Sequence, residues 1–294
     1  MDRAVGGCLA AVVVLVRRGS GHRVTWAWVL AASVAALALE PVWQDHVFGQ
    51  VNAILMLLVL VDVLHPERRW SGVLVGVAAG VKLTPLVFVV LLLLVGQRAA
   101  AARAGATFAA TVVVGLVAFP GAPSYWTDGL LDPTRVGPPA LAHNQSVAGA
   151  LTRVLGAPPS TVLWVAVALP LAAGVLVVAR AWWRRGDRVL AACLAALAML
   201  LASPVSWSHH WVWAVPTALA LWQRSRVAAV LWTAVFVARP MLWLPWGQGR
   251  ELDWRWWEHL PGNAYVLAAL GVAAWLALRS PGAPPWRGRR SSSS

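Results

Sequence analysis

The chain has 294 residues, of which 60% are hydrophobic and only 12% are charged. A soluble globular domain has about 25% charged residues, and the apolar runs here recur along the whole length, which one water-soluble core cannot absorb. The formal net charge is +13, but the cations form short clusters between the apolar runs. That placement is typical of membrane topology signals and excludes a nucleic-acid-binding stripe.

The first apolar run, residues 4–16, is short and is followed at once by Arg17 and Arg18. It lacks the A-x-A cleavage pattern of a signal peptide, so we expect the tail of a helix whose beginning is missing. Residues 1–23 would then be the remnant of an earlier helix plus a cytoplasmic loop, within one multi-spanning domain, 1–279. The next candidate spans are 24–39, 51–64, 105–119, 160–179, 189–203, 211–222, 227–239 and 263–278.

Residues 72–96 form an apolar segment that arginine clusters flank on both sides. The segment must therefore leave the cytoplasmic side and return to it, although it is too short for two full crossings. Because Pro85 ends a helix just before itself, we expect two half-length helices, 72–82 and 85–96. Lys82, the single lysine of the chain, then lies at a broken-helix tip within the membrane region. An ionisable group there is a functional candidate, and the alternative is a lysine that snorkels to an interface.

Arginine placement orients the chain, because the cytoplasmic connections of membrane proteins are rich in Lys and Arg. One set of alternate connections holds 17 of the 24 cations, whereas the other set holds five. We therefore expect the first set to be cytoplasmic. Its members are Arg17, Arg18, Arg23, Arg68, Arg69, Arg98, Arg103, Arg180, Arg184, Arg185, Arg188, Arg224, Arg226, Arg279, Arg287, Arg289 and Arg290.

The opposite, outer face gathers polar residues, which predicts one polar cavity that opens outward. Five of the seven histidines belong to it: His46, His143, His209, His210 and His259. Adjacent histidines point about 100° apart on a helix and seldom share one ion, so we expect no metal at His209 and His210. Gln50 and Asn52 begin a predicted helix, and their alternative role is to cap it. Residues 145–155 are weakly amphipathic and are expected along the membrane interface.

Four polar segments occur in order on this predicted outer face. They are Glu40-Pro41-Val42 with Gly49-Gln50-Val51-Asn52, then Gly80-Val81-Lys82-Leu83-Thr84-Pro85, then His143-Asn144-Gln145-Ser146, and last Ser203-Pro204-Val205-Ser206-Trp207-Ser208-His209-His210. Together they resemble the bacterial polyprenyl-phosphate-mannose-dependent α-mannosyltransferases, which are membrane enzymes of the GT-C type in glycosyltransferase family 87. The resemblance covers residues 24–280.

The resemblance implies an all-α, polytopic transmembrane helical bundle of the GT-C type, with its polar cavity on the extracytoplasmic side. It implies a multi-pass hexosyltransferase of the bacterial plasma membrane that needs no cofactor. Such an enzyme takes mannose from a polyprenyl-phosphate-mannose donor and passes it to a glycolipid or lipoglycan acceptor at the outer leaflet. The membrane lipids are further expected partners.

Glycosyl transfer needs a carboxylate to take the acceptor proton, and cations or hydrogen-bond donors for the leaving phosphate. Lys82, His209 and His210 suit the donor phosphate. The residues that suit the sugar or the acceptor are Gln50, Asn52, His143, Asn144, Gln145, Ser206 and Trp207. In the enzymes that the chain resembles, the catalytic acid lies in the first outer loop, which has no counterpart here. Asp45 and Glu40 are therefore the candidate carboxylates, and the chain is expected to be N-terminally truncated or inactive.

Two other classes of function remain open. A flippase for lipid-linked sugars would also have broken helices and a polar cavity, but it should show access to both faces and often internal repeats. A non-catalytic membrane subunit would need no base at all. The tail 280–294 contains a Pro-Pro pair and three arginines and ends in four consecutive serines, and we expect it to be a disordered cytoplasmic end.

Overall fold

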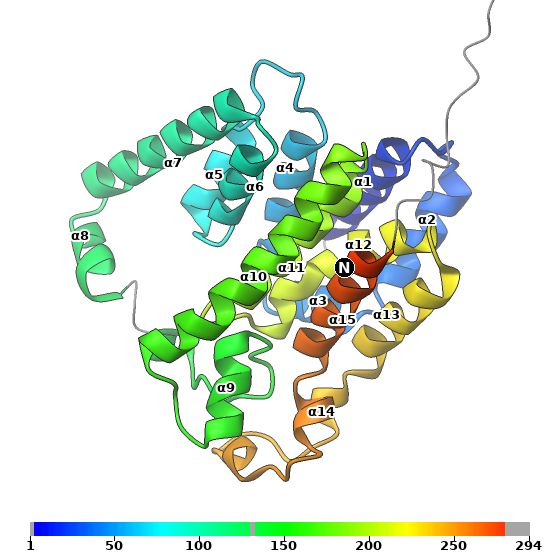
Figure 1. The fold of residues 1–294 in the computed structure, drawn as a ribbon. Helices are drawn as coiled ribbons and strands as arrows, with labels where there is room; N and C mark the ends of the chain where they lie inside the picture. Colours follow the sequence, from blue (N-terminus) through cyan, green and yellow to red (C-terminus); the bar gives the residue numbers. More distant parts are fainter. Residues whose placement is uncertain (1–2, 130–132, 280–294) are drawn as a thin grey trace, which may run out of the picture.

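The computed structural model describes residues 3–129 and 133–279, and this part of the chain is helical without a β-strand (Figure 1). The all-α expectation is confirmed; the predicted tail, 280–294, lies outside the described residues. The α-helices are α1 Arg3–Gly19, α2 Trp26–Ala36, α3 Glu40–Val47, α4 Asn52–Val63, α5 Val73–Val81, α6 Leu86–Leu94, α7 Arg98–Ala118, α8 Ala122–Ser124, α9 Val147–Leu155, α10 Thr161–Arg184, α11 Arg188–Ala202, α12 Ala214–Trp222, α13 Arg226–Ala238, α14 His259–Gly262 and α15 Ala264–Leu278.

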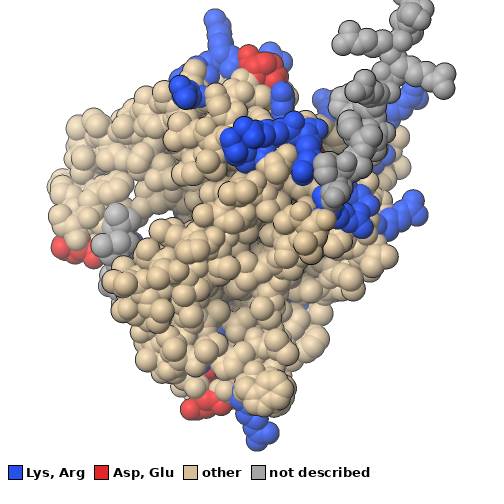
Figure 2. Space-filling model, in the orientation of Figure 1, with Lys and Arg blue, Asp and Glu red and all other residues tan. Residues whose placement is uncertain are grey.

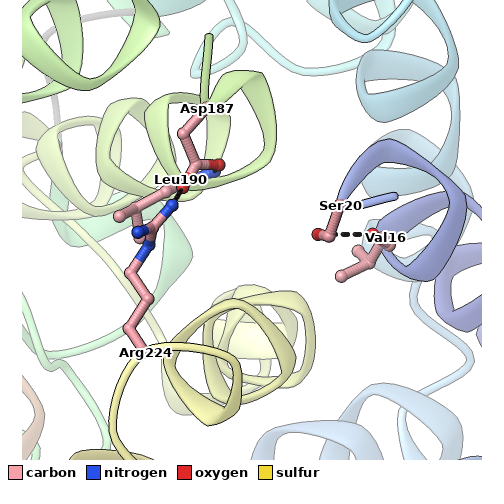
Figure 3. A network of polar contacts seen from close by, with 5 residues as sticks. All are labelled: Val16, Ser20, Asp187, Leu190 and Arg224. Atoms are coloured by element: carbon pink, nitrogen blue, oxygen red, sulfur yellow. Dashed lines mark hydrogen bonds and ion pairs between the residues drawn. The ribbon is translucent and has the colours of Figure 1, made fainter. Parts of the chain in front are cut away.

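Helix α11 is the centre of the bundle, and every residue from Val189 to Leu201 is buried. The longer α10 lies along it, as Figure 1 shows. The start of α11 is fixed by Asp187, whose Oδ1 accepts a hydrogen bond from the Leu190 N–H at 3.0 Å. Its other oxygen pairs with Arg224, which follows α12 (Figure 3). One carboxylate therefore caps the central helix and ties the end of α12 to it.

A stripe of glycines joins α5 to α7 at close range. Gly76 and Gly80 lie four residues apart in α5 and so share one helix face. Gly72, just before α5, continues the stripe, since a Cβ there would meet the Ala100 carbonyl oxygen of α7. A Cβ at Gly76 would lie 2.5 Å from the Ala104 carbonyl oxygen, and one at Gly80 would lie 2.2 Å from Thr111 Oγ1. Small residues that let two backbones approach are the usual basis of helix pairing in membranes. The stripe fixes α5, and with it Lys82 at the end of α5, against α7.

The broken helix predicted at 72–96 is confirmed. α5 ends at Val81 and α6 begins at Leu86, and Lys82 follows α5 in an extended conformation. Each half has nine residues, or about 14 Å at about 1.5 Å per residue, which is half of a membrane's hydrocarbon thickness. The two halves therefore bring Lys82 to the turn between them.

The segment that follows α2 differs from the prediction. Residues 40–47 lie between the candidate spans 24–39 and 51–64, where no helix was predicted, but they form α3, which is bent 77° from α2. Polar residues such as Gln44 and Asp45 interrupt the apolar pattern from which the spans were predicted. Pro41 in the first turn of α3, where proline is favoured, was the remaining helix signal. Helix α3 carries both candidate carboxylates, Glu40 at its start and Asp45 near its end.

Among the described residues, two helices are long and apolar enough to cross a membrane: α7 and α10. The bent pair of α2 and α3 could supply a third span. The shorter apolar helices α4, α11 and α15 have 12 to 15 residues and fall below the length of about 20 residues that a straight crossing needs. Helices of this length are tolerated where other helices cover their ends.

Charge divides the surface along the long axis of the molecule. Figure 2 shows most of the Lys and Arg side chains gathered at one end, around the ends of α1 and α10. The flank below them is nearly free of charged side chains in this view, and a smaller mixed cluster occupies the opposite end. This segregation agrees with an uncharged belt in lipid and with a cytoplasmic, arginine-rich end.

The close contact at the glycine stripe predicts that alanine destabilises the protein at one glycine and not at another. Gly76→Ala should lower the free energy of unfolding of the detergent-solubilised protein by roughly 1–3 kcal/mol, because the new methyl group meets the backbone of α7. Gly105→Ala is the matched control, since a Cβ at Gly105 of α7 meets no atom within 4 Å. It should leave stability unchanged or raise it by about 0.5–1 kcal/mol, as alanine favours a helix. A Gly76→Ala variant as stable as the control would contradict the close α5–α7 contact.

Candidate active site

The turn between α3 and α4 buries a carboxylate. Asp45 is completely buried, and its Oδ1 accepts a hydrogen bond from Asn52 Nδ2 at 2.8 Å. Its Oδ2 accepts a longer bond, 3.4 Å, from the Ala53 backbone N–H in the first turn of α4. A negative charge is stabilised there by the free N–H groups and by the helix dipole. Asp45 therefore holds the start of α4 and the Asn52 side chain in place.

The Asn52 amide continues this contact to Lys82. Its Oδ1 accepts a hydrogen bond of 3.0 Å from Lys82 Nζ, while its Nδ2 donates to Asp45 and, at 3.4 Å, to the carbonyl oxygen of His209. A side-chain amide has both a donor and an acceptor, so the uncharged Asn52 can bridge the Asp45 carboxylate and the Lys82 ammonium. We call Asp45, Asn52 and Lys82 the relay. It links the α3–α4 turn to the tip between α5 and α6.

The space beside the relay is small. A cavity of about 20 Å³ lies against Asn52, Lys82, Ser206 and His210, and apolar side chains of α4, α6 and α11 line most of the rest. That volume holds about one water molecule. The wide polar cavity expected from the sequence is not shown in the part of the chain that the structure describes, because apolar side chains fill the space between the polar ones.

The paired histidines lie on a 3-10 helix, Ser208–Trp213, between α11 and α12. The His209 ring contacts the His210 ring edge-on at 4.6 Å and the Phe48 ring at 5.5 Å. Burial and the nearby Lys82 ammonium lower the pKa of His209 to about 4, so its imidazole is neutral at neutral pH. Lys82 is the cation of this group, and His209 can serve as a neutral hydrogen-bond donor or acceptor.

The second candidate carboxylate, Glu40, belongs to a separate buried cluster. It is 2% exposed, and its Oε2 accepts a hydrogen bond of 3.0 Å from the Tyr265 hydroxyl. Its other oxygen has no hydrogen-bond partner among the described residues. The Tyr265 ring packs on Phe236 and Trp211, with centroids 4.2 and 5.6 Å apart. Glu40 thus ties the α2–α3 elbow to α15.

Several residues predicted to contact sugar join two loops in this structure. Asn144 and Gln145 are completely buried, and Ser206 is 1% exposed. The Gln145 N–H donates to the Ser206 carbonyl at 2.8 Å, and the Ser206 N–H donates to Asn144 Oδ1 at 3.0 Å. The Gln145 side chain also donates to Gly262 O and accepts from the Tyr265 N–H. In this arrangement these residues hold the loops together, and their contact with a sugar stays a prediction.

The other predicted sugar-contacting residues lie nearer the surface. Gln50 is exposed, with one long hydrogen bond of 3.4 Å to the Phe48 carbonyl. His143 is half-buried and meets the Trp246 ring edge-on at 5.0 Å. Burial lowers the pKa of His143, against the opposing influence of the Glu251 carboxylate. Trp207 is half-buried beside Gly137. His143 and Trp246 together present an aromatic edge from two different loops.

Sequence reasoning missed a buried arginine that supports this region. Arg153 of α9 is 1% exposed and donates to the carbonyls of Ala140, Leu141 and Asn144 and to Asn263 Oδ1. In the sequence, Arg153 is one of the five cations that lie outside the arginine-rich set of connections. The amphipathic pattern of residues 147–155 could have indicated that Arg153, beside Thr152, lies on the buried face of α9. Arg153 fixes the backbone that precedes the loop residues Asn144 and Gln145.

Comparison with known proteins supplies a family. A model described as glycosyltransferase family 87 matches residues 4–204. A polyprenol-phosphate-mannose-dependent alpha-(1-2)-phosphatidylinositol mannoside mannosyltransferase of Mycobacterium tuberculosis is 38% identical over 257 residues, which are 84% of this chain and 60% of the relative. The protein of the same name from Mycolicibacterium smegmatis is 36% identical over 275 residues, 86% of this chain and 62% of the relative.

A third relative acts on a different acceptor by name. It is a polyprenol-phosphate-mannose-dependent alpha-(1-2)-phosphatidylinositol pentamannoside mannosyltransferase of Mycobacterium tuberculosis, 36% identical over 279 residues, 88% of this chain and 61% of the relative. The chain spans about 60% of the length of these curated relatives. No solved structure matches the chain.

The relay predicts unequal effects for two neighbouring amides. Asn52→Leu removes the donor to buried Asp45 and the acceptor for Lys82, so it should lower the free energy of unfolding by roughly 1–3 kcal/mol. Gln50→Leu, at an exposed amide two residues away, should change it by less than about 0.5 kcal/mol. Thermal unfolding in detergent measures both. Equal shifts of the two melting temperatures would show that the hydrogen bonds of Asn52 to Asp45 and Lys82 do not contribute to stability.

Proposed function

The chain belongs to glycosyltransferase family 87, and from this premise we propose that it is a membrane mannosyltransferase. Its donor is a polyprenyl-phosphate-mannose, and its acceptor is a glycolipid of the phosphatidylinositol mannoside class at the outer leaflet. The relatives' names support both parts of the proposal. The setting is a bacterial plasma membrane that the chain crosses more than once, which the arginine-rich end and the long apolar helices α7 and α10 support.

The observation that carries the proposal is the relay. A leaving polyprenyl phosphate needs positive charge and hydrogen-bond donors at the bond that breaks. Lys82 Nζ uses one of its three donors on Asn52, and His209 and His210 lie on the adjacent 3-10 helix. We assign the phosphate to the remaining donors of Lys82, with the imidazoles of His209 and His210 beside it. The present cavity of about 20 Å³ holds about one water molecule, so this assignment requires the tip between α5 and α6 to open on donor binding.

We assign a positioning role to Asp45. Both of its oxygens accept hydrogen bonds and neither is exposed, so in this arrangement it acts on the phosphate site through Asn52. Its use as the base, and the use of Glu40 in that role, stay predictions that the same assay addresses. A base must reach the acceptor hydroxyl, so this use requires the α3–α4 turn to open on substrate binding.

The test is mannosyl transfer in membranes from a bacterial host that expresses this chain. Radiolabelled polyprenyl-phosphate-mannose and a phosphatidylinositol mannoside are supplied, and label is counted in the acceptor. The wild-type chain should transfer mannose, and Lys82→Met should lower the rate by roughly 100-fold or more, as loss of one donor to a developing anion does. Arg69→Gln, at an exposed arginine near the α4–α5 turn, is the charge-matched control and should retain the wild-type rate.

Three outcomes would count against parts of this account. Full transfer by Asp45→Asn and Glu40→Gln would remove both carboxylates from the mechanism. Full transfer by Lys82→Met would remove the phosphate assignment. Movement of the labelled donor across the bilayer without a covalent product would identify a flippase, and no transfer to any such acceptor would contradict the enzyme proposal itself.

A further inference from the structure

A large apolar groove lies between α2, α12 and α13, and its volume is about 510 Å³. Apart from Thr233, its lining consists of alanine, valine, leucine and tryptophan, and seven of its fifteen residues are alanine. Short side chains on three neighbouring helices leave the hollow. Its volume lies within the range of about 300–1,000 Å³ that is usual for pockets that enclose a small ligand.

The groove has a cationic end. Trp28 at the start of α2 and Trp222 at the end of α12 line it there. The guanidinium of Arg17 lies over the Trp28 ring at 4.2 Å, and that of Arg226 lies over the Trp222 ring at 5.5 Å. Both arginines belong to the set predicted to be cytoplasmic. The two indoles and two guanidiniums form a collar of the residue types that favour the level where lipid headgroups meet the acyl chains.

The lining at the other end of the groove is aliphatic. Leu39, in the α2–α3 elbow, and Val237, near the end of α13, lie there. A ligand that fits both ends is therefore a long apolar chain with a negatively charged head at the arginine end. Phospholipids of the cytoplasmic leaflet have this form, and juxtamembrane arginines attract the anionic ones.

We propose that this groove binds an acyl chain of an anionic phospholipid, whose phosphate lies between Arg17 and Arg226. The lipid fills the space between α2 and α13 and makes these two peripheral helices part of the bundle. α2 packs loosely against the rest of the protein, because only Val29 and Ala36 of its eleven residues are buried. A bound acyl chain supplies the missing packing on its inner face.

The groove is separate from the relay. The cavity at Lys82 and the groove have no lining residue in common. Figure 1 places α2 and α13 on one side of the bundle and α5 and α6 on the other. The polyprenyl chain of a donor held at Lys82 would therefore have to pass around α12 to enter the groove. The lipid site stands independently of the proposed transferase activity.

The test uses native mass spectrometry of the detergent-purified chain with added phosphatidylglycerol or phosphatidylcholine. The wild type should retain phosphatidylglycerol in preference. The variant Ala35→Phe with Ala234→Phe fills the groove and should lower retention by at least about fivefold. Ala166→Phe is the matched control, because it adds the same side chain to an exposed alanine of α10, and it should retain phosphatidylglycerol as the wild type does.

A second variant leaves the groove intact. Arg226→Gln should reduce the preference for phosphatidylglycerol over phosphatidylcholine, whereas Arg69→Gln, an arginine outside the collar, should not. Equal retention of the two lipids by the wild type would overturn the proposal, as would unchanged retention in the groove-filled variant. Recovery of a polyprenyl phosphate instead of a phospholipid from the groove would also overturn it and would assign the groove to the donor.

Discussion

The hydrogen bond from the Lys82 ammonium to the Asn52 amide joins the two chain breaks on which the candidate site depends. One break is the turn between α5 and α6, which Pro85 imposes, and the other is the turn between α3 and α4. A break in a membrane helix leaves polar backbone and side-chain groups that must find partners inside the protein. Here Asp45 accepts from the start of α4 and from Asn52, and Asn52 accepts from Lys82. The same contacts thus satisfy the breaks and assemble the site.

The rest of the bundle keeps these two breaks in register. The glycine stripe presses α5 onto α7, and the buried α11, capped by Asp187, lies beside α4, α6 and the 3-10 helix that carries His209. At the opposite end from the arginine clusters, Arg153 and the paired amides of Asn144 and Gln145 hold the loops around His143. The few charged side chains that are buried, among them Asp45 and Arg153, therefore act as internal hydrogen-bonding groups that hold the loops and helix ends together.

The sequence was sufficient for the helices, because apolar runs and proline have direct structural consequences. It located the half-helices around Lys82 and the segments of α4, α10, α11, α13 and α15 to within a few residues. It failed for α3, where no helix was predicted, because the partners of the buried Asp45, the Asn52 side chain and the Ala53 N–H, lie beyond the turn in α4. It placed the four polar segments around one polar cavity, which the described residues do not show. Periodicity and motif order cannot predict tertiary hydrogen bonds, such as the one that the Ser206 N–H donates to Asn144.

The central claim is that Lys82 and Asn52 act as a unit, and a double-mutant cycle tests it most directly. The free energy of unfolding in detergent is measured for the wild type, Asn52→Leu, Lys82→Met and the double variant. If the two side chains are hydrogen-bonded as described, the double variant should differ from the sum of the single effects by about 0.5–3 kcal/mol. Effects that add to within about 0.3 kcal/mol would show that the two residues are independent, and the site would have to be built on other contacts.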